Sequence, residues 1–153
     1  MNTRLNFWEK GQQAMHAMFA LGKHLSKSTL SPELRHLISY RVSQINGCAF
    51  CLDMHAKDLL ALDENPQRLL VLSAWREAPF YSEKERAALA FTEALVLLAD
   101  GMIPEAVYEQ ASAHFTEAEL IDLAIVVVAT GGWNRINIAF GADTGSYQVG
   151  MYH

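Results

Sequence analysis

Two predicted helices meet at the segment Gln44-Ile45-Asn46-Gly47-Cys48-Ala49-Phe50-Cys51-Leu52-Asp53-Met54-His55. Asn46-Gly47 breaks a helix, and the pattern after it predicts a new helix that begins at or near Cys48. At about 100° per residue, Cys51 lies about 60° short of a full turn from Cys48, and His55 projects between them. Two thiols and a base on one helix face can form a disulfide, exchange a proton or bind a metal.

Helical periodicity continues on both sides of this segment, and clear start signals divide it into elements. Ser31-Pro32 supplies an N-cap serine and a proline at the first helical position. Ser82 and Thr116 each open a capping box, completed three residues later by a glutamate. We expect helices over about residues 7–26, 32–44, 48–62, from 66 to about 75, 83–98, 104–114 and 117–137.

One short segment has the composition of a strand, Ile125-Val126-Val127-Val128. A capping box precedes it and no second strand is available as a partner, so we assign it to a helix. Gly131-Gly132 is expected to bend or interrupt that helix. With no internal repeat or linker, residues 1–153 predict a single all-α domain of six or seven helices.

Composition excludes several classes of partner. The chain has 153 residues, enough to bury one core, and a formal charge of −5 with scattered basic residues. We therefore expect no nucleic-acid partner and no anionic membrane surface. The N-terminus lacks a signal-like apolar run, and the longest apolar run, Leu123–Ala129, is too short to span a bilayer. The expected compartment is the cytoplasm, where a disulfide is transient and catalytic.

A thiol pair at a helix start favours peroxide chemistry. Unpaired N–H groups and the partial positive charge of the first turn stabilise a thiolate. His55, one turn after Cys51, can accept the thiol proton. One thiolate attacks a peroxide oxygen and becomes a sulfenic acid, the second thiol condenses with it, and an outside reductant restores the pair. This chemistry needs neither a cofactor nor a metal.

Other readings of the same cysteines stay open. Cys48, Cys51, His55 and His36 have the right atoms for zinc, although structural zinc sites usually pair two ligand clusters and no second cluster follows. Both cysteines could instead be inert core residues. Haem attachment is excluded, because Leu52 rather than histidine follows the second cysteine.

Three segments resemble a known family. Residues 41–57 resemble the core motif of the carboxymuconolactone decarboxylase superfamily, in its AhpD-like (alkylhydroperoxidase) branch. Residues 85–94 resemble the helix that follows in that branch, and Trp133-Asn134-Arg135-Ile136-Asn137 resembles its C-terminal Asn-Arg signature. The resemblance covers about residues 30–140. It implies an all-α fold, homo-oligomers (trimers or hexamers), and peroxidase activity through the cysteine pair.

The resemblance also assigns roles. Cys51 would be the peroxidatic cysteine, Cys48 the resolving cysteine, and His55 part of a proton relay. The relay of the family includes a glutamate twelve residues before the first cysteine, and His36 stands at that position here. An imidazole can pass a proton but supplies no fixed negative charge, so we expect Glu33 or Glu93 to substitute.

A second departure lies between the cysteines. The most active enzymes of the branch have a histidine where this chain has Phe50, which cannot relay a proton. We therefore expect weak turnover of a small-molecule hydroperoxide with an unidentified thiol reductant, or a different disulfide-exchange role, such as a carrier or a sensor. A lactone decarboxylase is disfavoured, because decarboxylase members generally lack the cysteine pair.

Overall fold

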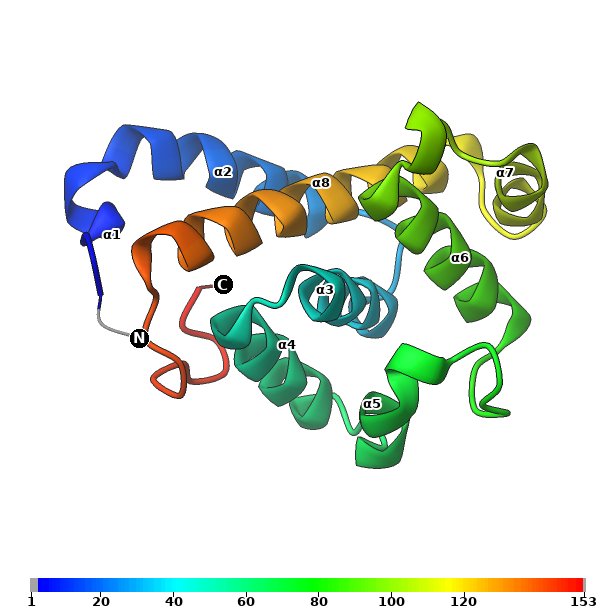
Figure 1. Cartoon of the computed structure of the whole chain (residues 1–153), viewed down its shortest axis with the longest axis horizontal. Helices are drawn as coiled ribbons and strands as arrows, with labels where there is room; N and C mark the ends of the chain where they lie inside the picture. The colour runs from blue at the N-terminus through cyan, green and yellow to red at the C-terminus, as the bar shows by residue number, and fades with distance from the viewer. Residues whose placement is uncertain (1–2, 153) are drawn as a thin grey trace.

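The computed structural model describes residues 3–152, which form eight α-helices and two short 3-10 helices with no β-strand in that range (Figure 1). The prediction of an all-α fold is confirmed, and Ile125–Val128 is helical. The elements are α1 (Phe7–Lys10), α2 (Gln12–Leu25), α3 (Pro32–Asn46), α4 (Ala49–Ala61), α5 (Pro66–Val71), η1 (Leu72–Ala74), α6 (Glu83–Leu97), η2 (Ala99–Gly101), α7 (Glu105–Ser112) and α8 (Glu117–Phe140).

Local capping residues start the long helices where the sequence predicts. The Ser31 side chain accepts a hydrogen bond from the Leu34 N–H at the start of α3. Ser82 begins α6 and Thr116 begins α8, and both capping boxes are complete. These caps satisfy N–H groups that a helix leaves unpaired in its first turn.

The helix boundaries differ from the prediction at two glycine positions. The first predicted helix is split at Gly11 into α1 and α2, which raises the number of helices from seven to eight in the described residues. A Cβ at Gly11 would lie 2.9 Å from the Phe7 carbonyl oxygen, so this tight break requires glycine. Gly131 and Gly132 do not interrupt α8, which is continuous. A Cβ at Gly132 would lie 2.7 Å from the Met18 methyl carbon, so this glycine allows α2 to approach α8 closely.

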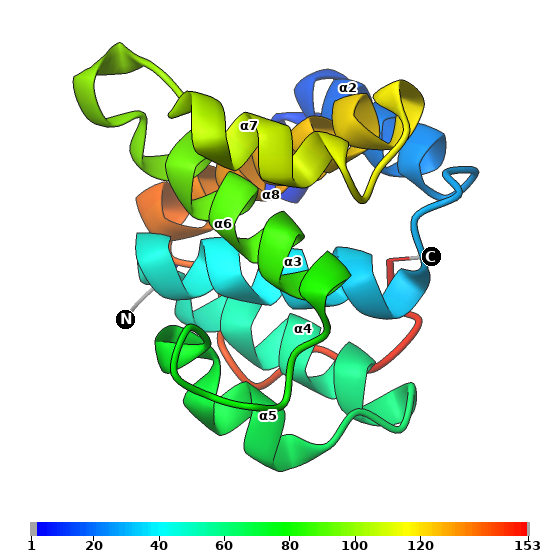
Figure 2. The ribbon, with the colours of Figure 1, turned by 90° about the vertical axis from the view of Figure 1, so that its right-hand side faces the viewer.

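Helix α3 lies at the centre of the fold. It packs against α8 on one side and α4 on the other, and also contacts α6. Figure 2 shows this arrangement edge-on, with α8 above α3, and with α4 and then α5 below it. The core between these helices is aliphatic, with fully buried members Leu37, Ile38, Val42, Leu59, Leu72, Leu89 and Leu123. By length and composition alone α8 could also cross a membrane, a test that the core helix of a soluble protein passes equally.

The two ends of the described chain return toward the start of α4. The Arg4 N–H donates to the Phe140 carbonyl, which places the N-terminal segment against the end of α8. After Gly141, which ends α8 with a φ of 70°, residues 142–152 form an irregular tail that runs beside α4 (Figure 1). Both ends therefore lie close to the cysteine pair.

Candidate redox site

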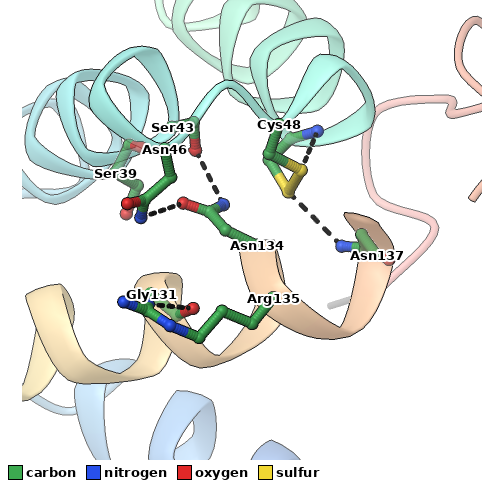
Figure 3. The surroundings of a disulfide bond; sticks show 9 residues. Ser39, Ser43, Asn46, Cys48, Gly131, Asn134, Arg135 and Asn137 are labelled. Atoms are coloured by element: carbon green, nitrogen blue, oxygen red, sulfur yellow. Dashed lines mark hydrogen bonds between the residues drawn. A yellow bond between two sulfur atoms is a disulfide. The ribbon is translucent and has the colours of Figure 1, made fainter. Parts of the chain in front are cut away.

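A tight turn places the cysteines against α8. Gly47 ends α3 with a φ of 70°, and the Cys48 N–H donates to the Ser43 carbonyl at 3.1 Å. Asn134 of α8 is fully buried and holds this turn: its Oδ1 accepts from Asn46 at 2.9 Å, and its Nδ2 donates to the Ser43 hydroxyl at 3.1 Å (Figure 3). The helix break and the neighbouring helix are therefore joined through one buried amide.

Cys48 and Cys51 form a disulfide in this structure (Figure 3). Their Cα atoms are 5.3 Å apart, within the range that a disulfide spans. Cys48 is the N-cap of α4, and its sulfur accepts the Cys51 N–H at 3.3 Å. The Asn137 side-chain Nδ2 donates to the Cys51 sulfur, also at 3.3 Å. Each sulfur thus faces a hydrogen-bond donor, an environment that favours a thiolate when the pair is reduced.

The disulfide is covered by protein. Both cysteines are 1% exposed, and they cluster with Phe50 of α4 and Tyr147 of the tail. Met54, Ala142 and Tyr152 pack around this cluster. Burial is what an inert core pair would show, but the bond between the two sulfurs is the product expected of a redox pair.

A second polar cluster lies one helical turn further along α4. Nδ1 of His36 and Nδ1 of His55 are 3.3 Å apart, so the two predicted site histidines are brought together. Oδ2 of Asp58 lies 3.6 Å from Nδ1 of His36, and Asp58 is 4% exposed. We call His36, His55 and Asp58 the imidazole–carboxylate cluster. Its carboxylate supplies the negative charge that His36 lacks.

The prediction that Glu33 or Glu93 supplies this charge was wrong. Glu33 is exposed in the first turn of α3. Both oxygens of Glu93 are engaged elsewhere: Oε1 accepts from Arg41 and Trp75, and Oε2 accepts from Arg76. Burial alone would raise the pKa of Glu93, but these three donors outweigh burial and hold its pKa below the ordinary value.

The tail is anchored to the same carboxylate. The Tyr147 hydroxyl donates to Oδ1 of Asp58 at 2.6 Å, and both side chains are buried. Burial raises the pKa of Tyr147, and its contact with Asp58 raises the pKa further. Lys57 pairs with Asp53 and also donates to the Gly145 and Tyr147 carbonyls, at 3.3 Å and 3.0 Å. These contacts fix the tail over the cysteines.

The imidazole–carboxylate cluster also has donor atoms suited to a metal ion. One nitrogen from each histidine and one oxygen of Asp58 all lie within 4.8 Å of one another. A tetrahedral zinc ion with bonds of about 2.0–2.1 Å places its ligands about 3.3 Å apart. The His36–His55 and His36–Asp58 atom pairs lie 3.3 Å and 3.6 Å apart. The zinc set of Cys48, Cys51, His55 and His36 is not assembled, because the cysteines are bonded to each other.

Sequence reasoning missed three residues of this site. Asp58 lies three positions after His55 on the same helix, so helical spacing alone could have indicated it. Asn137 lies three positions after Asn134 in the segment with family resemblance, but nothing in the sequence connects it with Cys51. Tyr147 falls in a polar tail without periodicity, and no signal in the sequence indicates its contact with Asp58.

Comparisons with known proteins agree with this geometry. Residues 12–94 match the sequence profile described as the carboxymuconolactone decarboxylase family. The uncharacterised protein YdfG of Bacillus subtilis is 38% identical over 141 residues, which cover 92% of this chain and 96% of YdfG.

Solved structures with the same fold include two informative neighbours. The Agrobacterium tumefaciens protein ATU0492 is of unknown function and is described as an AhpD antioxidant defence candidate. The comparison of ATU0492 with this chain gives a TM-score of 0.90 and 35% sequence identity. It covers 95% of this chain and 100% of ATU0492. The debrominase Bmp8 has a TM-score of 0.78 at 22% identity, covering 90% of this chain and 74% of Bmp8, a similarity of fold alone. From the matched profile, YdfG and ATU0492, the chain belongs to the carboxymuconolactone decarboxylase family, in its AhpD-like branch.

Proposed function

We propose that this protein is a thiol-dependent hydroperoxide reductase, with Cys51 as the peroxidatic cysteine and Cys48 as the resolving cysteine. The observation that carries the proposal is the Cys48–Cys51 disulfide at the start of α4, one turn from two paired imidazoles. The described AhpD-type neighbour supports a redox role for this pair.

The proposed cycle has three steps: peroxide oxidises Cys51, Cys48 condenses with the oxidised Cys51, and a dithiol reduces the disulfide. The Cys51 thiolate attacks the terminal oxygen of R–O–O–H, so that an S–O bond forms, the O–O bond breaks and an alkoxide leaves. The alkoxide takes a proton and departs as the alcohol, while Cys51 becomes a sulfenic acid. Cys48 then attacks the Cys51 sulfur, the S–O bond breaks, and hydroxide leaves as water after protonation. An external dithiol supplies the two electrons that reduce the disulfide.

The imidazole–carboxylate cluster is suited to move the proton in this cycle. His55 accepts the Cys51 thiol proton and later returns it to the leaving alkoxide. His36, 3.3 Å from His55, extends the path, and the Asp58 carboxylate stabilises positive charge on the imidazole pair. In this proposal His36 and Asp58 together take the place of the glutamate in the family's proton relay.

The test measures hydroperoxide consumption with excess dithiol. Cys51→Ser should abolish turnover. In a separate incubation without dithiol, pre-reduced Cys48→Ser should consume one equivalent of hydroperoxide and stop at a sulfenic acid, which a dimedone adduct detects by mass. Equal steady-state rates in wild type and Cys51→Ser would refute the proposal.

A second candidate function is a disulfide carrier or redox sensor. The burial of both sulfurs and the apolar Phe50 between them favour it, because neither assists rapid peroxide turnover. This function predicts a measurable redox potential for the pair with negligible hydroperoxide consumption. The assay above therefore separates the two functions.

We also propose that the chain forms homo-oligomers and that it works in a reducing compartment. Residues on the outer face of α8, Ile121 and Val128, are 63% and 56% exposed, which supports burial against a second copy in a trimer or hexamer. Ile121→Asp with Val128→Asp should then reduce the mass measured by light scattering to that of one chain. A cytoplasmic location would supply the thiol reductant continuously.

A further inference from the structure

The imidazole–carboxylate cluster is built on two helices that are packed against each other. Helix α3 carries His36, and α4 carries His55 and Asp58 three positions apart, so these two side chains lie on one face of α4. The neighbouring residues Leu37 and Leu59 are at most 1% exposed, which fixes both helix backbones in the core. Donor atoms held on packed helices are positioned more precisely for a ligand than donor atoms on a loop.

The donor atoms of this cluster have the spacing that a small metal ion requires. Nδ1 of His36 lies 3.3 Å from Nδ1 of His55 and 3.6 Å from Oδ2 of Asp58. One nitrogen of each histidine and one oxygen of Asp58 all lie within 4.8 Å of one another. Ligands of tetrahedral zinc are about 3.3 Å apart. Two separations are already close to this value, and a small rotation of the side chains brings all three donors to one ion.

A neighbouring hydroxyl orients the carboxylate. Tyr147 donates to Oδ1 of Asp58 at 2.6 Å, and Oδ2 is the oxygen that lies toward His36. Carboxylates that bind metal ions are commonly held by such a hydrogen bond from a second residue. Lys57, the adjacent residue of α4, pairs with Asp53 and donates to two carbonyls of the tail. The negative charge of Asp58 therefore faces the imidazoles.

The cluster is accessible from its histidine side. The His36 side chain is 19% exposed and His55 is half-buried, whereas the Asp58 side chain is 5% exposed. An ion can therefore enter past the imidazoles and meet the carboxylate at the inner end of the site. The disulfide keeps both cysteine sulfurs out of this ligand set.

We propose that His36, His55 and Asp58 form a binding site for a divalent transition-metal ion of the Zn²⁺ type. Imidazole nitrogens suit these ions, whereas Mg²⁺ and Ca²⁺ prefer sites made of oxygen atoms. Three protein ligands leave the fourth position of a tetrahedral ion for a water molecule, as in open zinc sites. The site follows from the cluster alone and does not depend on the proposed redox function.

Occupation of this site has a consequence for turnover, which rests on the proposed function. A neutral imidazole has one nitrogen that accepts a hydrogen bond and one that donates. When Nδ1 of His55 binds the ion, Nε2 carries the hydrogen, so neither nitrogen can accept the Cys51 proton. Metal binding and proton transfer therefore exclude each other, and the ion inhibits the enzyme without contact with either sulfur.

The binding test titrates the untagged disulfide form with ZnCl₂ at pH 7 in a calorimeter, so that thiolates cannot contribute. We expect one zinc ion per chain, no binding of Mg²⁺, and an affinity lower by about tenfold or more in His36→Gln, His55→Gln and Asp58→Asn. The matched controls Asp63→Asn and His114→Ala change exposed residues outside the cluster and should bind as wild type does. Wild-type affinity in the three cluster variants, or no saturable binding in wild type, would overturn the proposal.

A spectroscopic test uses wild type and needs no variant to fold. Co²⁺ occupies tetrahedral zinc sites and absorbs visible light strongly there, but only weakly in octahedral surroundings. We expect a strong visible band when the disulfide form binds Co²⁺, and loss of the band when Zn²⁺ is added. A weak spectrum of the octahedral kind would overturn the proposed geometry.

A single-turnover test separates the metal site from the proposed function. Pre-reduced protein, freed of dithiol, receives hydroperoxide with or without saturating ZnCl₂. We expect zinc to slow oxidation by about 100-fold or more, the range for loss of a general base, and Asp58→Asn to need about tenfold more zinc. Equal zinc sensitivity in Asp58→Asn would assign the inhibition to the thiols and overturn the exclusion of proton transfer by the ion. Zinc binding to the cluster together with negligible hydroperoxide consumption in zinc-free protein would refute the proposed function and leave the metal site supported.

Discussion

Replacing Tyr147 with phenylalanine removes one hydroxyl and should loosen the tail that covers the disulfide. That hydroxyl donates to the buried Asp58 carboxylate at 2.6 Å. A hydrogen bond to a charged group contributes about 1.5–3 kcal/mol, and here both partners are buried, so solvent cannot replace it easily. In a protein of this size 1 kcal/mol shifts Tm by about 2–4 °C, so we expect Tyr147→Phe to lower Tm by about 3–12 °C.

The assays are thermal unfolding, which gives Tm, and urea unfolding, which gives the free energy of unfolding, both on the disulfide form at pH 7 and followed by circular dichroism. Tyr152→Phe is the matched control, because it makes the same change in the same tail and the Tyr152 hydroxyl has no hydrogen bond within residues 3–152. We expect the control to change the free energy of unfolding by less than about 0.5 kcal/mol. The disulfide of Tyr147→Phe should also react faster with a small phosphine reductant. Equal losses in the two variants would refute the view that the Asp58 contact anchors the tail.

The pH dependence of the same comparison has a definite sign. Burial and Asp58 raise the pKa of Tyr147 above its ordinary value of 10. Below pH 10 the hydroxyl is neutral in both folded and unfolded chains, so the advantage of wild type over Tyr147→Phe is constant. Above pH 10 the unfolded chain loses this proton first, so the advantage declines as pH rises through the raised pKa. Unfolding curves from pH 7 to 11 measure this, and an advantage that grew above pH 10 would contradict the assigned contact.

Three further changes test other parts of the site. His55→Ala should lower hydroperoxide turnover by about 10²–10⁴-fold through loss of the proton acceptor, whereas His114→Ala on the surface should not, and equal rates would exclude His55 from the relay. Glu93→Gln should lower the free energy of unfolding by about 3 kcal/mol at pH 7. Because the folded pKa of Glu93 is lowered, this difference should shrink as pH falls below about 4, and a pH-independent loss would contradict the ion pairs. Zinc should slow turnover reversibly by binding the imidazole–carboxylate cluster, with recovery on adding a chelator, and Asp58→Asn should bind it at least tenfold more weakly by calorimetry.

The sequence was sufficient for those parts of the fold that are determined within a few residues. A helix start depends on its cap and the next few residues: a proline after Ser31, and a reciprocal glutamate after Ser82 and Thr116. These three starts were therefore predicted correctly. The break at Gly11 was missed because the periodicity continues across it. The clash that requires glycine there involves a backbone oxygen one turn away, which periodicity does not reveal.

The site was less predictable because it combines elements that are distant along the chain. His55 was identified by its spacing after the cysteines, and the relay position of His36 by family resemblance. The contact between the two histidines depends on the packing of α3 against α4. Asn137 lies 86 positions from Cys51, and no local pattern connects them. Helical spacing places Asp58 one turn after His55, but only the three-dimensional arrangement shows that the Asp58 carboxylate also faces His36.

The buried disulfide places different demands on the two halves of the proposed cycle. Asn137, whose amide contacts the Cys51 sulfur, also lines a surface pocket, and we expect a small hydroperoxide to approach Cys51 from this side without displacement of the tail. A dithiol reductant must contact a sulfur that is 1% exposed, so reduction requires residues 142–152 to move away from α4. The contact that resists this movement joins Tyr147 to Asp58, and Asp58 also faces His36. Opening the tail therefore changes the surroundings of the proton path at the same time as it exposes the disulfide.

We expect Tyr147→Phe to accelerate the reductive half of the cycle and to leave the rate of Cys51 oxidation by a small hydroperoxide nearly unchanged. Stopped-flow measurement of each half-reaction would separate the two, and equal acceleration of both would contradict separate routes to the sulfurs.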